Sequence, residues 1–377
     1  MKVHSRRYVL CLLLALWTSP APGFHASAEG RRNWAELVES LSEPGGYFDS
    51  DNLISNETSY VTVLPRLRDL KLQGGVYIGV GPDQNFTYLT TLRPEQAIVI
   101  DIRRQNMLQH LLLKALMERA RSRLEYLALL VSRPVTLPAD LGRALSIEEL
   151  LHAVDSAPPD LELYGRNLRW VLSHIGGKFG LHLSKQDLEA IDYVYGNFRE
   201  YGLDIRYRSY GRPFQRRYPT LRGLILERDL EGEYGNYLAL ESNFQWLKKF
   251  QEENHLIPVV GDLGGKAAMK KIARYLTQNH RQVQAFYVSN VEFYLMRNGA
   301  FDAYVENVRR LPVRRNGIFI RSYFGYGMPH PEQVDGHWMS SVLQYIGSFL
   351  RQQDLAPYYT HRDLATRDYI SILKREE

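Results

Sequence analysis

Short apolar runs rich in β-branched and aromatic residues recur along the chain and are typical of buried strands. The clearest occupy residues 76–80, 97–100, 256–260, 283–288 and 317–321, and residues 369–373 predict a further, closing strand. The runs are too short for buried helices, so we interpret them as the strands of one sheet.

Amphipathic segments lie between these runs. In residues 103–130, leucines and alanines recur at helical spacing and predict one long helix. Further helices are predicted at residues 31–41, 60–70, 85–92, 240–254, 266–278 and 337–353. Strands that alternate with helices pair in parallel. The predicted fold class is therefore α/β, with a Rossmann-like, mostly parallel sheet flanked by helices.

The alternation pauses after the second strand. Residues 132–235 contain helical pieces at 147–153, 161–174 and 185–201, separated by glycine-rich turns. We interpret this stretch as a helical insertion. The predicted organisation is then an N-terminal half of the sheet domain at residues 29–131, the insertion at 132–235, and a second half at 236–377.

The first 28 residues resemble a signal peptide. Lys2, Arg6 and Arg7 precede a short apolar core at residues 8–17, and Ala26-Ser27-Ala28 forms a small-residue cleavage site. The sequence thus predicts an exported protein, periplasmic or secreted, with an uncleaved signal anchor as the alternative. Cys11 is the only cysteine and lies within this segment, so the mature chain would have no disulfide or thiol nucleophile.

Charge and composition narrow the function little. The net charge is +5 and is spread along the chain, with a modest basic stretch at residues 206–217. We find no basic-aromatic pattern specific for nucleic acid, no histidine spacing typical of a metal site, and no membrane span in the mature chain. The oligomeric state is not predicted.

A glycine turn offers the first candidate site. Gly79 and Gly81 end the first strand, and Asp101 ends the second strand 20 residues after Gly81. This spacing is typical of an acid that binds a ribose. A dinucleotide fingerprint would have a third glycine where Gln84 stands. The turn therefore favours a nucleoside cofactor without a pyrophosphate.

Three segments carry a resemblance to class I S-adenosylmethionine (SAM)-dependent methyltransferases, and most closely to an uncharacterised bacterial methyltransferase-like family. They are Tyr77-Ile78-Gly79-Val80-Gly81-Pro82-Asp83-Gln84-Asn85, Val259-Val260-Gly261-Asp262-Leu263-Gly264-Gly265 and Tyr287-Val288-Ser289-Asn290-Val291-Glu292. With residues 98–101 they cover the predicted sheet domain, about half of the mature chain.

The resemblance implies roles for individual residues. It implies that Gly79, Gly81, Asp101 and Asp262 contact SAM, and that the pair Asn290 and Glu292 lies at the reaction centre, with Glu292 as a candidate general base. Asp262 and Asn290 are also candidates for capping the helices that follow them. No acid precedes the glycine turn, although one is usual in that family.

Two functions remain open. The first is a SAM-dependent methyltransferase that acts on an unknown acceptor. The second is an exported binding or scaffold protein that keeps the methyltransferase fold without catalysis. Export favours the second, because SAM is made in the cytoplasm, unless the domain stays inside or is exported with its ligand.

Overall fold

The computed structural model describes residues 28–135, 139–210, 218–325 and 327–373. The predicted signal peptide therefore lies outside the described residues except for Ala28, and most of the basic stretch at 206–217 lies outside them too. Among the described helices, none is long and apolar enough to cross a bilayer.

A six-stranded sheet forms the centre of the molecule, in the order β3-β2-β1-β4-β5-β6. Strands β1 to β5 run parallel, and β6 pairs antiparallel to β5 at the edge. The strands are β1 Val76–Val80, β2 Gln96–Asp101, β3 Leu256–Val260, β4 Val283–Ser289, β5 Val313–Tyr323 and β6 Ser340–Tyr345. The predicted α/β class with a mostly parallel sheet is confirmed.

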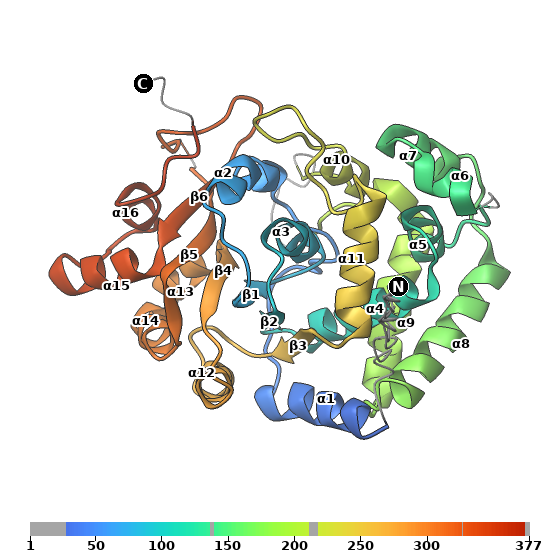
Figure 1. The fold of residues 1–377 in the computed structure, drawn as a ribbon, viewed down its shortest axis with the longest axis horizontal. Helices are drawn as coiled ribbons and strands as arrows, with labels where there is room; N and C mark the ends of the chain where they lie inside the picture. Colours follow the sequence, from blue (N-terminus) through green and yellow to red (C-terminus); the bar gives the residue numbers. More distant parts are fainter. Residues whose placement is uncertain (1–27, 136–138, 211–217, 326, 374–377) are drawn as a thin grey trace, which may run out of the picture.

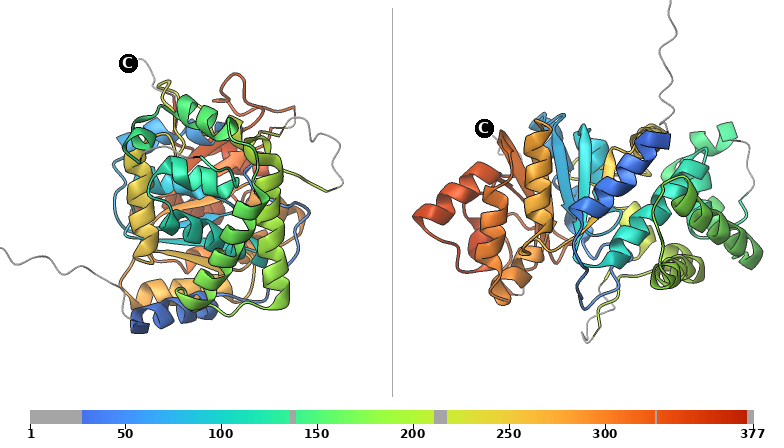
Figure 2. Two further views of the ribbon diagram at one scale, coloured as in Figure 1. Left: turned by 90° about the vertical axis from the view of Figure 1, so that its right-hand side faces the viewer. Right: turned by 90° about the horizontal axis from the view of Figure 1, so that it is seen from below.

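Helices flank this sheet (Figures 1 and 2). In Figure 1, α14 to α16 lie at one end of the molecule and α5 to α9 at the other. The helices are α1 Ala28–Leu41, α2 Leu64–Asp69, α3 Gln84–Leu92, α4 Arg104–Arg119, α5 Arg123–Leu130, α6 Ala139–Ala144, α7 Ile147–Asp155, α8 Leu161–Gly177, α9 Lys185–Tyr201, α10 Leu221–Ile225, α11 Glu241–Glu252, α12 Ala268–Gln278, α13 Val291–Arg297, α14 Phe301–Arg309, α15 Ile346–Leu355 and α16 His361–Thr366, with short 3₁₀ turns η1 Thr58–Val61 and η2 Gly202–Asp204.

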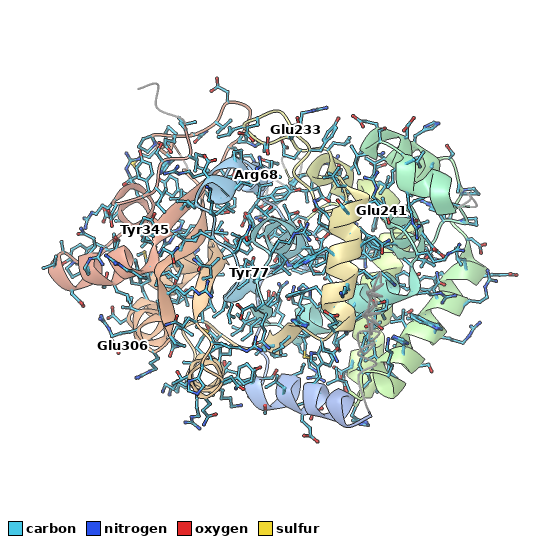
Figure 3. All side chains as sticks on the ribbon, viewed as in Figure 1. Arg68, Tyr77, Glu233, Glu241, Glu306 and Tyr345 are labelled. Atoms are coloured by element: carbon cyan, nitrogen blue, oxygen red, sulfur yellow. The ribbon has the colours of Figure 1, made fainter. Side chains whose placement is uncertain are left out.

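Burial explains why the apolar runs form strands. All five residues of β1 and all five of β3 are buried, as expected for parallel strands covered on both faces. Tyr77 of β1 is 0% exposed and lies near the centre of the molecule, whereas Glu306 lies at its periphery (Figure 3). The starts of some helices are determined by the local sequence as well, because Ser146 and Ser184 form capping boxes at the N-termini of α7 and α9.

Three predicted elements are corrected. The helix expected at residues 103–130 is two helices, because the chain breaks after Arg119 and Ser122 caps α5 by accepting a hydrogen bond from the Glu125 N–H. The helix expected at 337–353 is strand β6 followed by α15. The closing strand at 369–373 is a single bridge between Leu343 and Ile370.

The sheet order creates a crevice. The chain builds β1, β2 and β3 outward on one side of β1 and then crosses to build β4 and β5 on the other. Neighbouring loops at the carboxyl ends of β1 and β4 therefore diverge, and ligands of open parallel sheets bind at such a point.

Candidate functional site

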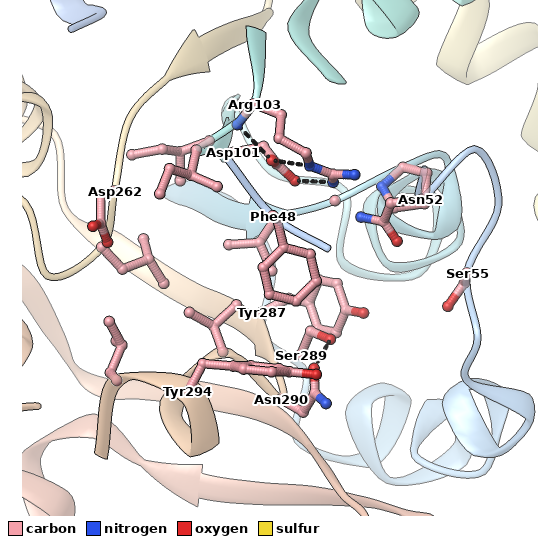
Figure 4. A pocket seen from close by; sticks show the side chains of 18 of the residues that line it. Phe48, Asn52, Ser55, Asp101, Arg103, Asp262, Tyr287, Ser289, Asn290 and Tyr294 are labelled. Atoms are coloured by element: carbon pink, nitrogen blue, oxygen red, sulfur yellow. Dashed lines mark hydrogen bonds and ion pairs between the residues drawn. The ribbon is translucent and has the colours of Figure 1, made fainter. Parts of the chain in front are cut away.

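A cavity lies at the carboxyl ends of β1, β2, β3 and β4 (Figure 4). Gly81, Asp101, Asp262 and Asn290, which come from the ends of these four strands, all line it. The structure therefore brings together four of the six predicted site residues. The segment of residues 47–57, which precedes η1, contributes further lining side chains, among them Phe48, Asn52 and Glu57.

Gly81 has the conformation that its turn requires. Its φ is +79°, in the left-handed region that favours glycine. The His110 ring on α4 donates from Nε2 to the Gly81 carbonyl oxygen at 2.9 Å. This bond supports the turn, and His110 itself does not line the cavity.

Gly79 does not line the cavity, and its small size has another use. A Cβ at this position would lie 1.9 Å from Asn85 Oδ1 and 2.7 Å from the Tyr77 hydroxyl. Asn85 needs that space, because its amide donates to the carbonyl oxygens of Val80 and Pro82 while Tyr77 donates to it. The small size of Gly79 therefore leaves space for the Asn85 side chain, which holds the turn through its hydrogen bonds.

Asp101 lines the cavity with both carboxylate oxygens bonded to Arg103. The Arg103 Nε and Nη2 atoms lie 3.0 and 2.9 Å from Asp101 Oδ1 and Oδ2. The same guanidinium donates to the carbonyl oxygens of Ser50 and Asp51. Arg103 therefore compensates the charge of Asp101. It also connects the segment of residues 47–57 to the end of β2 through hydrogen bonds.

Asp262 does not cap α12. Its Oδ1 accepts a hydrogen bond from the Gly264 N–H at 2.9 Å, which closes a local turn. Glu43 bonds the start of α12 instead, because its Oε2 accepts from the N–H groups of Ala267 and Ala268. The half-buried Asp262 carboxylate remains part of the cavity wall.

The structure separates the two residues predicted at the reaction centre. Asn290 lines the cavity at the start of α13 and makes no side-chain cap. Glu292 is 0% exposed and does not line the cavity. Its carboxylate accepts from Arg321 Nε at 2.6 Å and from the Tyr304 hydroxyl at 2.8 Å. This geometry makes Glu292 part of a buried ion pair between α13 and β5.

Glu57 is a cavity residue that the sequence did not single out. Its side chain is 1% exposed and lines the cavity. Its carboxylate accepts hydrogen bonds from the Ser289 hydroxyl and, at 2.8 Å, from Gln84 Nε2. The same Gln84 amide donates to the Tyr287 hydroxyl at 2.9 Å. Glu57 stands in a polar stretch that predicts only a loop, so no local signal marks it.

Ser289, the partner of Glu57, has an unusual backbone. It ends β4 with φ +52°, a left-handed conformation that is uncommon for residues other than glycine. Such conformations gather at functional sites, where the surrounding structure holds them in place. The Glu57 carboxylate is one of the groups that hold Ser289.

The cavity wall carries more negative than positive groups. Among the described lining residues, the carboxylates are Glu57, Asp101 and Asp262, and Arg103 is the one residue of the lysine, arginine and histidine types. Burial, and then the Glu57 charge, raise the pKa of the Tyr287 hydroxyl well above its usual range. The wall thus favours a cationic ligand over an anionic one.

Comparison with known protein families shows which family the chain belongs to. A family model described as a domain of unknown function, DUF7790, matches residues 52–136 and 182–371. The chain belongs to this family. No curated protein matches the sequence. The matched segments include Glu57, Gly81, Asp101, Asp262 and Asn290, whereas residues 137–181, which contain α6, α7 and α8, fall between them.

Proposed function

We propose that this protein binds SAM, or a close relative of SAM, in the cavity at the carboxyl ends of β1 to β4. The net negative charge of the wall carries the proposal. SAM bears a sulfonium and an ammonium against one carboxylate, so it is a cation overall. A dinucleotide would bring its negatively charged pyrophosphate into a cavity whose wall contains Glu57, Asp101 and Asp262, and like charges repel at short range.

The strand order supports a Rossmann-like interpretation of the sheet. The three segments that resemble SAM-dependent methyltransferases end at one cavity, where Gly81, Asp262 and Asn290 lie. We further propose that the helices between β2 and β3 include an insertion centred on residues 137–181, because the family model passes over that stretch. The family resemblance and the export of the chain remain part of the proposal.

Methyl transfer is the catalytic version of this function. Holding donor and acceptor in line supplies much of the rate of such a displacement. Glu292 is bonded to Arg321 and does not line the cavity, so we propose that it is not the base. This observation favours the second candidate, a binding protein without transfer. Formation of S-adenosylhomocysteine during incubation with SAM and a cell extract that supplies methyl acceptors distinguishes the two.

Calorimetric titration of the purified chain tests the binding proposal. We expect SAM and S-adenosylhomocysteine to bind and NAD not to bind. Asp101→Asn should weaken SAM by about tenfold or more, because it leaves the Arg103 cation uncompensated beside a cationic ligand, and should weaken S-adenosylhomocysteine, which has no net charge, less. An absence of heat or thermal stabilisation with SAM would overturn the proposal.

A further inference from the structure

Glu57 is a buried carboxylate that no cation compensates within the described part of the chain. Its side chain is 1% exposed, and its carboxylate accepts hydrogen bonds from the neutral donors Ser289 and Gln84. None of the ion pairs among the described residues includes it. A carboxylate taken out of water needs a cation or several strong donors. Because Glu57 lines the cavity, a ligand in the cavity is the remaining source of such a partner.

The position of Glu57 is fixed by its neighbours. Its own N–H donates to the Ser55 hydroxyl at 3.1 Å, and its two oxygens are bonded to β4 through Ser289 and to the start of α3 through Gln84. The carboxylate therefore sits between the ends of β1 and β4, at the switch point. A carboxylate whose two oxygens both accept hydrogen bonds from the protein is already oriented before a ligand binds.

The surroundings select a positive ligand group. The rings of Phe48, Tyr287 and Tyr294 line the same cavity (Figure 4). Aromatic faces attract cations, and they exclude the water that would otherwise screen a charge. Arg103, the one cationic side chain among the described lining residues, is bonded to Asp101. It is therefore not available to Glu57.

We propose that Glu57 is the receiving group of a subsite for an ammonium ion of a ligand. An ammonium presents three N–H donors, and Glu57 and Asn290 place carboxylate and amide oxygens on the cavity wall. The inference rests on the proposed function in placing a nucleoside ligand beside this subsite. The ammonium belongs either to the amino-acid end of that ligand or to an amine that binds next to it.

Glu57→Gln is a suitable test variant. Glutamine has the same shape, its amide oxygen can accept from Gln84, and its amide nitrogen can donate to the Ser289 hydroxyl. Both internal contacts are therefore retained while the charge is lost. Glu227→Gln is the matched control, because Glu227 is a partly buried carboxylate that does not line the cavity. Thermal unfolding of both variants checks that they fold.

Calorimetry with three probes separates the two sources of the ammonium. S-adenosylhomocysteine carries the amino-acid end, 5′-methylthioadenosine lacks it, and n-butylamine supplies an ammonium alone. If the ammonium belongs to the nucleoside ligand, Glu57→Gln weakens S-adenosylhomocysteine about tenfold or more and leaves 5′-methylthioadenosine unchanged. If the ammonium belongs to a second ligand, each nucleoside binds to the variant as well as to the wild type. In that case n-butylamine binds to the wild-type protein with a nucleoside bound, but not to the variant with a nucleoside bound.

The proposal is overturned if Glu57→Gln changes the affinity for neither S-adenosylhomocysteine nor n-butylamine. A wild-type comparison is independent of the variant, since n-butylamine should bind and neutral n-butanol should not; equal binding of the two would also contradict the subsite. If neither nucleoside binds to wild-type protein, the proposed function fails. The amine titration then still decides whether Glu57 receives an ammonium.

Discussion

Gln84 has a structural role that the glycine pattern of the sequence does not reveal. Its presence in place of a third glycine argues against a pyrophosphate ligand. The structure adds a positive role, because the Gln84 amide bonds both Glu57 and Tyr287 at the cavity wall. A glycine at this position would remove that support.

Glu292 offers a test at the residue scale. Glu292→Gln should lower the free energy of unfolding by about 3–5 kcal/mol, because it leaves the guanidinium of Arg321, which is 1% exposed, without its counter-charge. Urea unfolding measures the change. Ligand affinity per folded molecule should stay at the wild-type value. Selective loss of SAM binding in a stable variant would return Glu292 to the site.

At the element scale, the sequence predicts a helix where β6 lies, because a buried strand lacks the alternation of polar and apolar residues that usually marks a strand. The first five residues of β6 are buried, so Ser340 to Gln344 show no alternation of polar and apolar positions. Pairing with β5, in which Ser341 lies opposite Ser322, decides the strand. The short helix α14 is likewise absent from the elements that the sequence predicts.

Helix α4 supports the glycine turn through His110, which gives a prediction for pH. Burial lowers the pKa of His110 to about 4, whereas an unfolded histidine titrates near 6.5. The unfolded chain therefore binds the proton more readily between these values, and stability falls as the pH drops from about 6.5 towards 4. The loss is at most about 3 kcal/mol.

His110→Gln isolates this contribution. A glutamine amide can donate to the Gly81 carbonyl oxygen without titrating. Urea unfolding at pH 7 and at pH 5 should show a smaller pH effect in the variant than in the wild type. Identical pH dependence in the two proteins would mean that His110 is not protonated on unfolding in this range.

At the scale of the whole molecule, a buried charge network joins α8 to the sheet domain. Glu118 on α4 pairs with Lys114 of its own helix and with His174 and Lys178, which belong to α8 and its end. Burial opposes ionisation of Glu118, but the bonds from His174, Lys114 and Lys178 outweigh it and lower its pKa to about 2. The network stabilises a helix that lies outside the matched family segments.

Stability should therefore depend on Glu118 in acid. The contribution is fully present above the unfolded glutamate pKa and is lost as the pH falls from about 4.5 towards 2. Glu118→Gln should cost about 3 kcal/mol at pH 7 and less at pH 2.5. Thermal unfolding of both proteins at the two pH values measures this. A cost independent of pH would point to packing instead.

The sequence by itself determined the five parallel strands, the α/β class and four of the cavity residues, because apolar runs and glycine turns are local features. It did not determine β6, the burial of Glu292 or the place of Glu57. Those depend on partners distant along the chain: β5 for β6, Arg321 for Glu292, and Ser289 for Glu57. A carboxylate in a polar stretch is not distinctive until folding removes it from water. Only the tertiary structure places Glu57 opposite the end of β4 and leaves its charge facing the cavity.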